Sequence, residues 1–180
     1  MPTPVGHSLV GYALYLSLIR DKLKKGWKTI LLVIFVSNLA DIDYLPGLIV
    51  GYPNRYHHGL THSLGFTLVV GALVALFYFC GHKQIRFFRL FLIFSIVYFS
   101  HIVLDFFAID TSFPYGEPLF WPVTKEYFIS PVSLFLDVRK ASTTDMFVRS
   151  LCSKHNLLAV ITECIILGGV IGIIQIVNKK

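Results

Sequence analysis

Three histidines lie within six positions, from His57 to His62, immediately before an apolar run that begins at Leu64. The Asp41-Ile42-Asp43 sequence closes another apolar run, and His101 and Asp105 lie near the end of a third. Imidazole nitrogens and carboxylate oxygens are the ligands of metal sites to which several helices each contribute side chains. Their recurrence at the ends of apolar segments predicts a metal site at a membrane edge.

The composition is too apolar for a soluble globular protein. Of 180 residues, 55% are hydrophobic and 14% charged, and the mean hydropathy is +0.69. We therefore expect an integral membrane protein. The first residues lack the basic region of a cleaved signal peptide, so we expect the first apolar segment to remain in the mature protein. The three cysteines show no CxxC spacing and are interpreted as incidental.

Five apolar segments predict an all-α, polytopic membrane bundle formed by one domain of residues 1–180. The last three are long enough to cross a bilayer. The first two hold about 15 residues each, or about 22 Å of helix against a hydrocarbon core of about 30 Å, so their ends must be extended by polar residues or the bilayer must be thinner there. The segments are Val5–Ile19, Trp27–Ala40, Leu64–Cys80, Phe87–Phe107 and Leu157–Val177.

The net charge of +6 reflects membrane topology rather than nucleic-acid binding. Basic residues gather where the apolar segments end: between residues 20 and 28, between residues 83 and 89, and at Lys179 and Lys180. With these clusters in the cytoplasm, the N-terminus is extracytoplasmic and all candidate ligands reach the outer face of a multi-pass inner (cytoplasmic) membrane protein. No nucleic-acid partner is expected.

The outer loop from Ala108 to Asn156 is too long to lack structure. A short helix is expected from Thr144 to about Lys154. Apolar residues between Phe128 and Leu136 favour a stretch lying in the headgroup layer of the bilayer.

His101 and Asp105 are four residues apart, so on a helix both side chains share one face. That geometry suits the ligands of one or two metal ions. Ionisable residues inside a membrane segment also indicate function. The alternative is a pair that satisfies its own hydrogen bonds at the interface.

Asp41 and Asp43 precede Pro46 and Gly47, which indicate the end of a helix. An extended stretch would let both carboxylates converge. The alternative is a solvated helix end. In the central motif, Gly59 permits close backbone approach, and Thr61 is expected to cap a helix that begins near His62.

Two further residues depend on how their segments lie. His7 precedes most of the first apolar segment and reaches the outer side if that segment crosses. Glu163, inside the last segment, is expected either to support the site or to have a structural role.

The chain resembles the YdjM-like, LexA-regulated inner-membrane metal-dependent hydrolases. The resemblance covers about two thirds of the chain, and its motifs occur in the family's order and spacing. They are Gly6-His7-Ser8, Ala40-Asp41-Ile42-Asp43, His57-x-Gly59-Leu60-Thr61-His62-Ser63, Ser100-His101-x-x-x-Asp105, and Gly116 through Leu119-Phe120-Trp121-Pro122. Family members usually carry arginine where this chain has His58, so an anion contact is missing here or replaced by an imidazolium.

These features predict a metal-dependent hydrolase that acts on an ester or phosphoester of a lipid or envelope-associated substrate, such as a phospholipid, through metal-activated water. One or two divalent ions are expected, zinc by ligand type, with Mn²⁺ or Fe²⁺ as alternatives. His58 and Asp43 are the predicted catalytic residues, and Glu117 and Trp121 the predicted substrate-binding residues. The alternative is a metal-binding or ion-handling membrane protein without catalysis. The predicted metal ligands are His7, Asp41, Asp43, His57, His62, His101 and Asp105.

Overall fold

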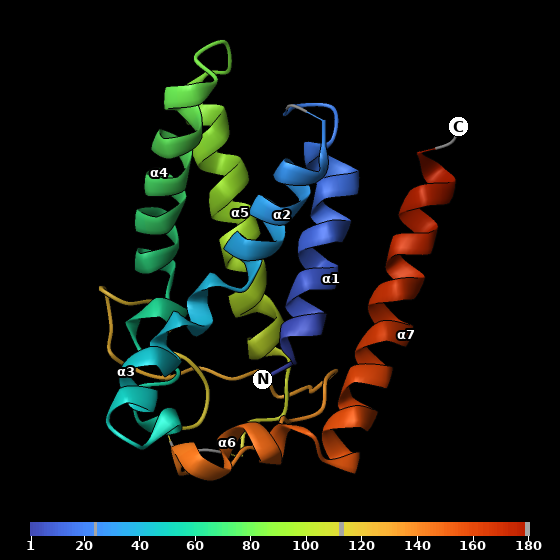
Figure 1. Ribbon diagram of the computed structural model, residues 1–180. Coiled ribbons are helices and arrows are strands. Elements are labelled where there is room, and N and C mark those ends of the chain that lie inside the picture. Colours follow the sequence, from blue (N-terminus) through green and yellow to red (C-terminus); the bar gives the residue numbers. More distant parts are fainter. Residues whose placement is uncertain (24, 112–113, 179–180) are drawn as a thin grey trace.

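The computed structural model describes residues 1–23, 25–111 and 114–178, and these residues form an all-helical bundle. Figure 1 shows helices α1, α2, α4 and α5 side by side, with α7 next to α1 and the short helices α3 and α6 below them. The helices are α1 (Pro4–Leu14), α2 (Trp27–Ser37), α3 (Tyr44–Ile49), α4 (Leu64–Gly81), α5 (Phe87–Phe106), α6 (Thr144–Leu151) and α7 (Lys154–Val177).

The long apolar runs became helices close to their predicted bounds. Helices α4, α5 and α7 are each long and apolar enough to cross a membrane. Helix α2 and the following segment Leu39–Ile49 pass the same test as a pair bent by 55°. Helix α1 continues as a π-helical turn, Tyr15–Ile19, and with it remains shorter than the other spans. The predicted polytopic bundle is confirmed.

The core lies where α1, α2, α4 and α5 meet. Val33 and Val36 of α2 pack there with Phe94 and Val97 of α5, and all four side chains are fully buried. Most of the large side chains of α7 are exposed, as expected for a helix whose surface faces lipid. The three cysteines are unpaired and exposed.

The region between α2 and α4 differs from the prediction. The two aspartates lie in a 3-10 helix, Leu39–Asp43, rather than in an extended stretch. Pro46 and Gly47 lie inside α3, so the prediction that they end the preceding helix was wrong. That helix ends at Ser37, where the chain turns into the tighter 3-10 geometry.

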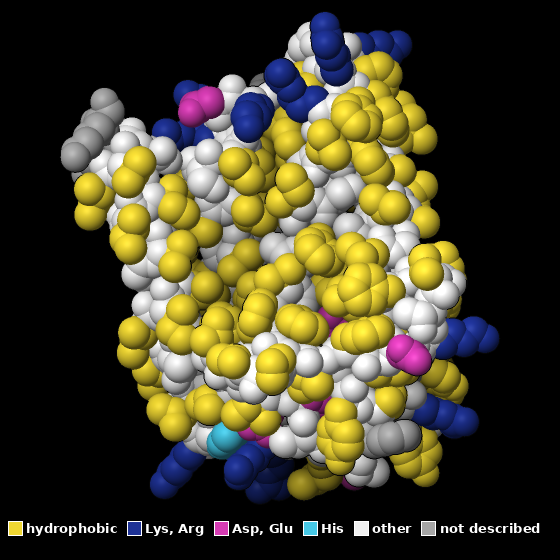
Figure 2. All heavy atoms as spheres, turned by 180° about the vertical axis from the view of Figure 1, so that it is seen from behind, with side chains coloured by type: hydrophobic (Ala, Val, Ile, Leu, Met, Phe, Trp, Pro, Cys, Tyr) yellow, Lys and Arg dark blue, Asp and Glu magenta, His cyan; other side chains and the backbone are white. Residues whose placement is uncertain are grey.

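The two ends of the bundle differ in chemistry. The loops that join α1 to α2 and α4 to α5 lie at one end, and the N-terminus, α3, α6 and the long loop lie at the other (Figure 1). Figure 2 shows basic side chains gathered at both ends, with a largely hydrophobic surface between them. All candidate ligands lie at the end opposite the α4–α5 loop, as the charge pattern predicted.

The outer loop crosses beneath the bundle and is tied to it by backbone contacts. Isolated bridges pair Ala108 with Phe135 and Glu117 with Phe128. The amides of Leu64 and Gly65, at the start of α4, donate to the carbonyls of Leu119 and Trp121 over 2.9 and 3.0 Å. The predicted helix at Thr144 is present and ends at Leu151. These contacts fix the loop over the polar end of the bundle.

Candidate metal centre

Residues from four separate segments meet at the polar end of the bundle. His7 lies in the first turns of α1, and His101 and Asp105 lie in the last turns of α5. Asp41 comes from the 3-10 helix Leu39–Asp43, and His62 from the 3-10 helix Leu60–His62. The side chains of His7, His62, His101 and Asp105 have no exposed surface. A polar cluster this deeply buried needs partners for its charges.

Asp105 lies at the centre of three imidazoles. Its Oδ1 is 3.3 Å from His7 Nε2. Its Oδ2 is 3.5 Å from His62 Nε2 and 3.3 Å from His101 Nε2. The rings of His7 and His101 are stacked, with centroids 3.6 Å apart and planes 9° from parallel. Asp41 completes the group, because its Oδ1 lies 3.6 Å from His101 Nε2 and 3.9 Å from His62 Nε2.

None of these close contacts has hydrogen-bond geometry. Within the described residues, the Nε2 atoms of His7, His62 and His101 have no hydrogen-bond partner, nor do Asp41 Oδ1 and both carboxylate oxygens of Asp105. Buried polar atoms in folded proteins almost always have partners. Nitrogen and oxygen lone pairs that converge without bonding to each other are the arrangement expected around a metal ion.

The opposite nitrogens of two of these rings are held in place. His101 Nδ1 donates to the Ser37 carbonyl over 2.8 Å, and His62 Nδ1 lies 3.2 Å from Asp43 Oδ2. Metal-binding histidines typically use the second nitrogen in this way, which fixes the tautomer and the ring orientation. The Nε2 atoms of His62 and His101 are thus oriented toward Asp105.

Asp43 supports the cluster from behind His62. Its Oδ2 accepts hydrogen bonds from the Gly59 amide at 3.3 Å and the Thr61 hydroxyl at 3.0 Å, and its Oδ1 lies 3.0 Å from His57 Nδ1. With these contacts filled, the geometry favours a positioning role for Asp43 over the ligand and catalytic roles predicted from sequence. Thr61 was predicted to cap α4, but the cap is Ser63, whose side chain accepts from the Phe66 amide.

His57 is occupied at both ring nitrogens. Nδ1 contacts Asp43, and Nε2 lies 2.7 Å from Met1 Sδ. The ring stacks on Tyr44, with centroids 4.0 Å apart. His57 remains close enough to Asp41 and Asp43 to complete a three-ligand group with them. Because both of its ring nitrogens already have contacts, His57 is placed at the edge of the candidate metal centre rather than among its main ligands.

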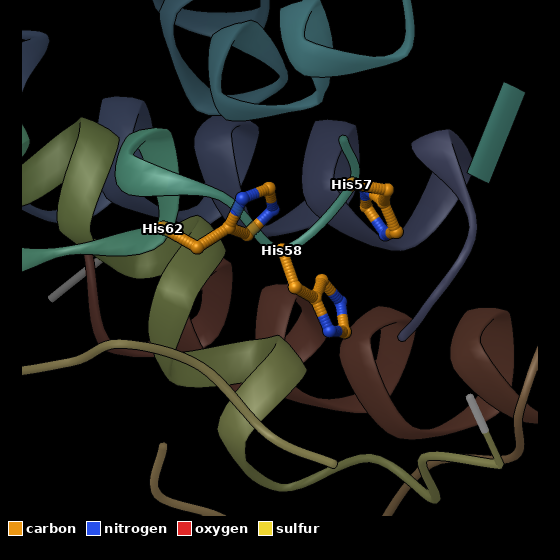
Figure 3. Close-up of side chains that lie close together, drawn as sticks. All are labelled: His57, His58 and His62. Atoms are coloured by element: carbon orange, nitrogen blue, oxygen red, sulfur yellow. The ribbon is translucent and has the colours of Figure 1, made fainter. Parts of the chain in front are cut away.

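His58 adopts an unusual backbone conformation, and its ring lies beside those of His57 and His62, with centroids 4.2 and 5.1 Å away. Its φ of 58° is in the left-handed region, where side chains other than glycine are uncommon. Figure 3 shows the ring of His62 pointing toward His57, while the ring of His58 points below the segment in that view. There His58 Nδ1 lies 3.4 Å from Asp110 Oδ2, and its Nε2 is buried without a hydrogen-bond partner in the described part of the chain.

Glu117 reaches the same region from the outer loop. Only 1% of the residue is exposed, and neither carboxylate oxygen has a hydrogen-bond partner among residues 1–23, 25–111 and 114–178. Burial raises the pKa of Glu117 well above its usual value, and the nearby Asp105 carboxylate adds to this effect. Glu117 was predicted to bind substrate, and it lies beside the ligands themselves.

Histidines of the central motif differ in protonation because their surroundings differ. Burial lowers the pKa of His57 well below its usual value, and burial also lowers the pKa of His58. Burial disfavours the charged form of His62 too, but the adjacent carboxylates of Asp105 and Asp43 outweigh it and raise the pKa of His62 to about 10. In the metal-free protein, the carboxylates beside His62 therefore favour its charged form.

A small cavity adjoins the cluster and includes residues that the sequence did not indicate. It is lined by Met1, His57, His58, Asp110 and Lys140, among others. The Lys140 ammonium donates to Tyr44 Oη and lies 2.8 Å from Met1 Sδ, and burial lowers its pKa. No motif spacing marks Asp110 or Lys140, because both belong to the irregular outer loop. Larger apolar grooves at the opposite end contain none of the candidate ligands.

Two other residues singled out from the sequence lie outside the cluster. Trp121 belongs to the outer loop and contacts the start of α4, where its carbonyl accepts from the Gly65 amide. Glu163 of α7 accepts from the Thr3 amide over 2.7 Å and from the Thr3 hydroxyl. Because Thr3 is the N-cap of α1, Glu163 holds the start of the helix that carries His7. Its role is structural support of the site.

The donor set fits a transition-metal ion such as zinc. Imidazole and carboxylate ligands suit Zn²⁺, and also Mn²⁺ or Fe²⁺. The Nε2 atoms of three histidines, both Asp105 oxygens and Asp41 Oδ1 are shielded from solvent and have no hydrogen-bond partner in the described residues. They therefore meet the first requirement of a metal site, that the ligands are in place before the metal binds. Oriented partners behind His62 and His101 meet the second requirement, a fixed tautomer.

The model of a family described as YdjM inner membrane protein matches residues 1–179. No curated protein and no solved structure matches the chain.

Proposed function

The chain belongs to the YdjM inner membrane protein family, and from this premise we propose that it is a membrane-embedded, metal-dependent hydrolase. One observation carries the proposal. Buried Nε2 atoms of His7, His62 and His101 converge with Asp41 and Asp105 without hydrogen bonding to them. Ligands from separate segments, buried in this way and oriented from behind, are typical of a metal site and support it over a structural ion-pair network.

The chain's own groups divide into those that bind the ion and those that orient them. His7, His62, His101, Asp41 and Asp105 would hold a divalent ion, with zinc as the first choice. When bound, such an ion supplies Lewis acidity and activates water for attack on an ester or phosphoester. Asp43 and the Ser37 carbonyl keep the rings of His62 and His101 in the binding orientation.

Cationic and hydrogen-bonding groups beside the cluster would receive the substrate. The Lys140 ammonium lies in the small cavity next to His57 and forms no ion pair with a carboxylate in the described residues. A phosphoryl oxygen is a suitable partner for an ammonium in such a cavity. The site lies at one end of the helical bundle, where lipid headgroups would lie if the bundle spans the membrane. We therefore propose a phosphoester of a lipid or an envelope-associated molecule as the substrate class.

The proposed site opens to the extracytoplasmic side, which the distribution of Lys and Arg supports. A carrier would need ionisable groups along a path through the bundle. Here apolar and aromatic side chains such as Val33, Phe94 and Val97 fill the core next to the cluster. This favours an enzyme over an ion-handling protein.

Turnover by purified protein tests the proposal. Protein stripped of metal and reloaded with zinc in detergent is incubated with a bacterial lipid extract, and products are identified by mass spectrometry. We expect a zinc-dependent product that disappears in Asp105→Asn. The matched control, Asp145→Asn, changes an exposed aspartate and should retain turnover. Zinc-dependent ion flux in proteoliposomes, with no product from any lipid class, would overturn the proposal in favour of ion handling.

A further inference from the structure

We propose that the cluster holds a second divalent cation, bound by His58, Glu117 and Asp105, with Asp105 shared between the two ions. The inference rests on the metal centre of the proposed function and extends it from one ion to a pair. It also gives His58 and Glu117 a role as ligands, which the sequence did not predict for either.

The three side chains approach one another closely enough to share an ion. One ligand atom from each lies within 4.8 Å of the other two. Asp105 also belongs to a second such group, with His7 and His101. A carboxylate common to two ligand groups is positioned to bridge two metal ions.

The ligand atoms at this second position are buried and without partners. His58 is 7% exposed, Asp105 5% and Glu117 1%. Within the described residues, His58 Nε2, both Glu117 oxygens and both Asp105 oxygens form no hydrogen bond. Water or neighbouring donors normally satisfy such groups. A cation placed among them would satisfy all three side chains at once.

His58 has the support expected of a metal ligand. Its Nδ1 faces Asp110 Oδ2 at 3.4 Å, and the Gly116 amide donates to the same oxygen over 2.7 Å. The left-handed backbone at His58 directs its ring to this side of the motif. The carboxylate behind Nδ1 leaves Nε2 for the ion, as it does in the pair formed by His62 and Asp43.

A cation near Glu117 would balance the carboxylates on this side of the cluster. A first ion among His7, His62 and His101 would neutralise Asp41 and Asp105. No Lys or Arg in the described part of the chain forms an ion pair with Glu117, and Asp110 pairs with His58. An unpaired buried carboxylate is costly. A second divalent ion at His58 and Glu117 removes that cost.

Metal stoichiometry tests the inference separately from catalysis. Wild-type protein, His58→Gln and Glu117→Gln are saturated with zinc, freed of excess ion by gel filtration, and analysed for zinc per chain. His82→Gln and Glu126→Gln, at the opposite end of the bundle and on the exposed loop, are the matched controls. We expect two zinc ions in the wild type and both controls, and one in each test variant.

Manganese gives an independent reading of the number of bound ions. With Mn²⁺ in place of zinc, the wild type should give the electron paramagnetic resonance spectrum of a spin-coupled pair, and Glu117→Gln that of an isolated ion. One zinc per wild-type chain with an uncoupled manganese spectrum would overturn the second site while leaving a single-metal hydrolase intact. Two ions retained in both test variants would overturn the assignment of the ligands, and no zinc in the wild type would overturn both proposals.

Discussion

Asp43 holds His62 by the nitrogen that faces away from Asp105, with Nδ1 and Oδ2 3.2 Å apart. His101 shows the same arrangement with the Ser37 carbonyl. The two rings thus present Nε2 to the same carboxylate from different segments. The orientation is built into the fold by groups that do not themselves need to touch the ion.

Asp43→Asn should weaken metal binding without abolishing it. The asparagine amide has one acceptor oxygen, whereas both oxygens of Asp43 now accept hydrogen bonds. It also lacks the negative charge that stabilises the orientation of the His62 ring. Loss of such a supporting carboxylate typically lowers metal affinity by about 10-fold to 100-fold. Competition with a fluorescent zinc chelator measures the change. Asp145→Asn is the control, and equal affinities in both variants would contradict the positioning role.

His62→Ala and Asp105→Ala should remove metal from the first position. Each variant deletes a side chain that faces the common point, whereas His82→Ala deletes an imidazole at the opposite end of α4. We expect metal content to fall several-fold in the first two variants and to match the parent in the third. Elemental analysis of monodisperse protein in detergent decides the outcome; unchanged zinc in both ligand variants would rule out the proposed centre.

Removal of metal should lower the thermal stability of the protein. A ligand that binds only the folded state at 100 times its Kd stabilises that state by about 2.7 kcal/mol. Chelator treatment should therefore lower the Tm, and zinc should restore it, in the wild type but not in Asp105→Ala. The melting curve of detergent-solubilised protein measures this, with magnesium addition as the control for ionic strength.

Metal affinity should rise with pH across the neutral and alkaline range. In the metal-free protein the pKa of His62 is raised to about 10, because the adjacent carboxylates of Asp105 and Asp43 outweigh burial. An ion that binds His62 must displace its proton. Below pH 10, each unit of increase should therefore strengthen binding by up to about tenfold for that proton. Calorimetry in buffers of different ionisation enthalpy counts the released protons, and none at pH 8 would show that His62 is not a ligand.

Glu163→Gln should destabilise the protein and shift His7. The carboxylate accepts from both the amide and the hydroxyl of Thr3, and an amide can accept at only one atom. Leaving a buried donor without a partner costs about 1 to 3 kcal/mol. We expect a lower Tm and a modest loss of zinc affinity. Thr162→Ala, which removes an exposed hydroxyl bonded only to its own helix, should change neither quantity.

The helices were predictable because long apolar runs leave few alternatives in a membrane. Helices α4 and α5 begin at Leu64 and Phe87, as predicted. The 3-10 helix around Asp41 and Asp43 was not predictable, because it depends on the bend between α2 and α3. The cap of α4 was not predictable either. Ser63 caps this helix because the backbone is extended there, whereas Thr61 lies in a 3-10 helix.

The candidate site was partly visible in sequence. His7, His62, His101 and Asp105 stood out because each interrupts or flanks an apolar segment. Asp110 and Lys140 did not stand out, since a charged residue in a polar loop is unremarkable until the loop is seen to fold beneath the bundle. Asp41 and Asp105 face the proposed ion, whereas Asp43 lies behind His62. This difference depends on side-chain direction, which sequence spacing does not specify.

The order of these groups along the chain bears on how the protein is assembled during synthesis. Every side chain of the first metal position lies before residue 106, and α7 comes only after the outer loop. Helix α7 packs on α1, and its Glu163 accepts a hydrogen bond from the Thr3 amide. During synthesis, the chain therefore contains the whole first ligand set before α7 is made. When α7 is added, it packs on α1 and fixes the start of that helix, which carries His7.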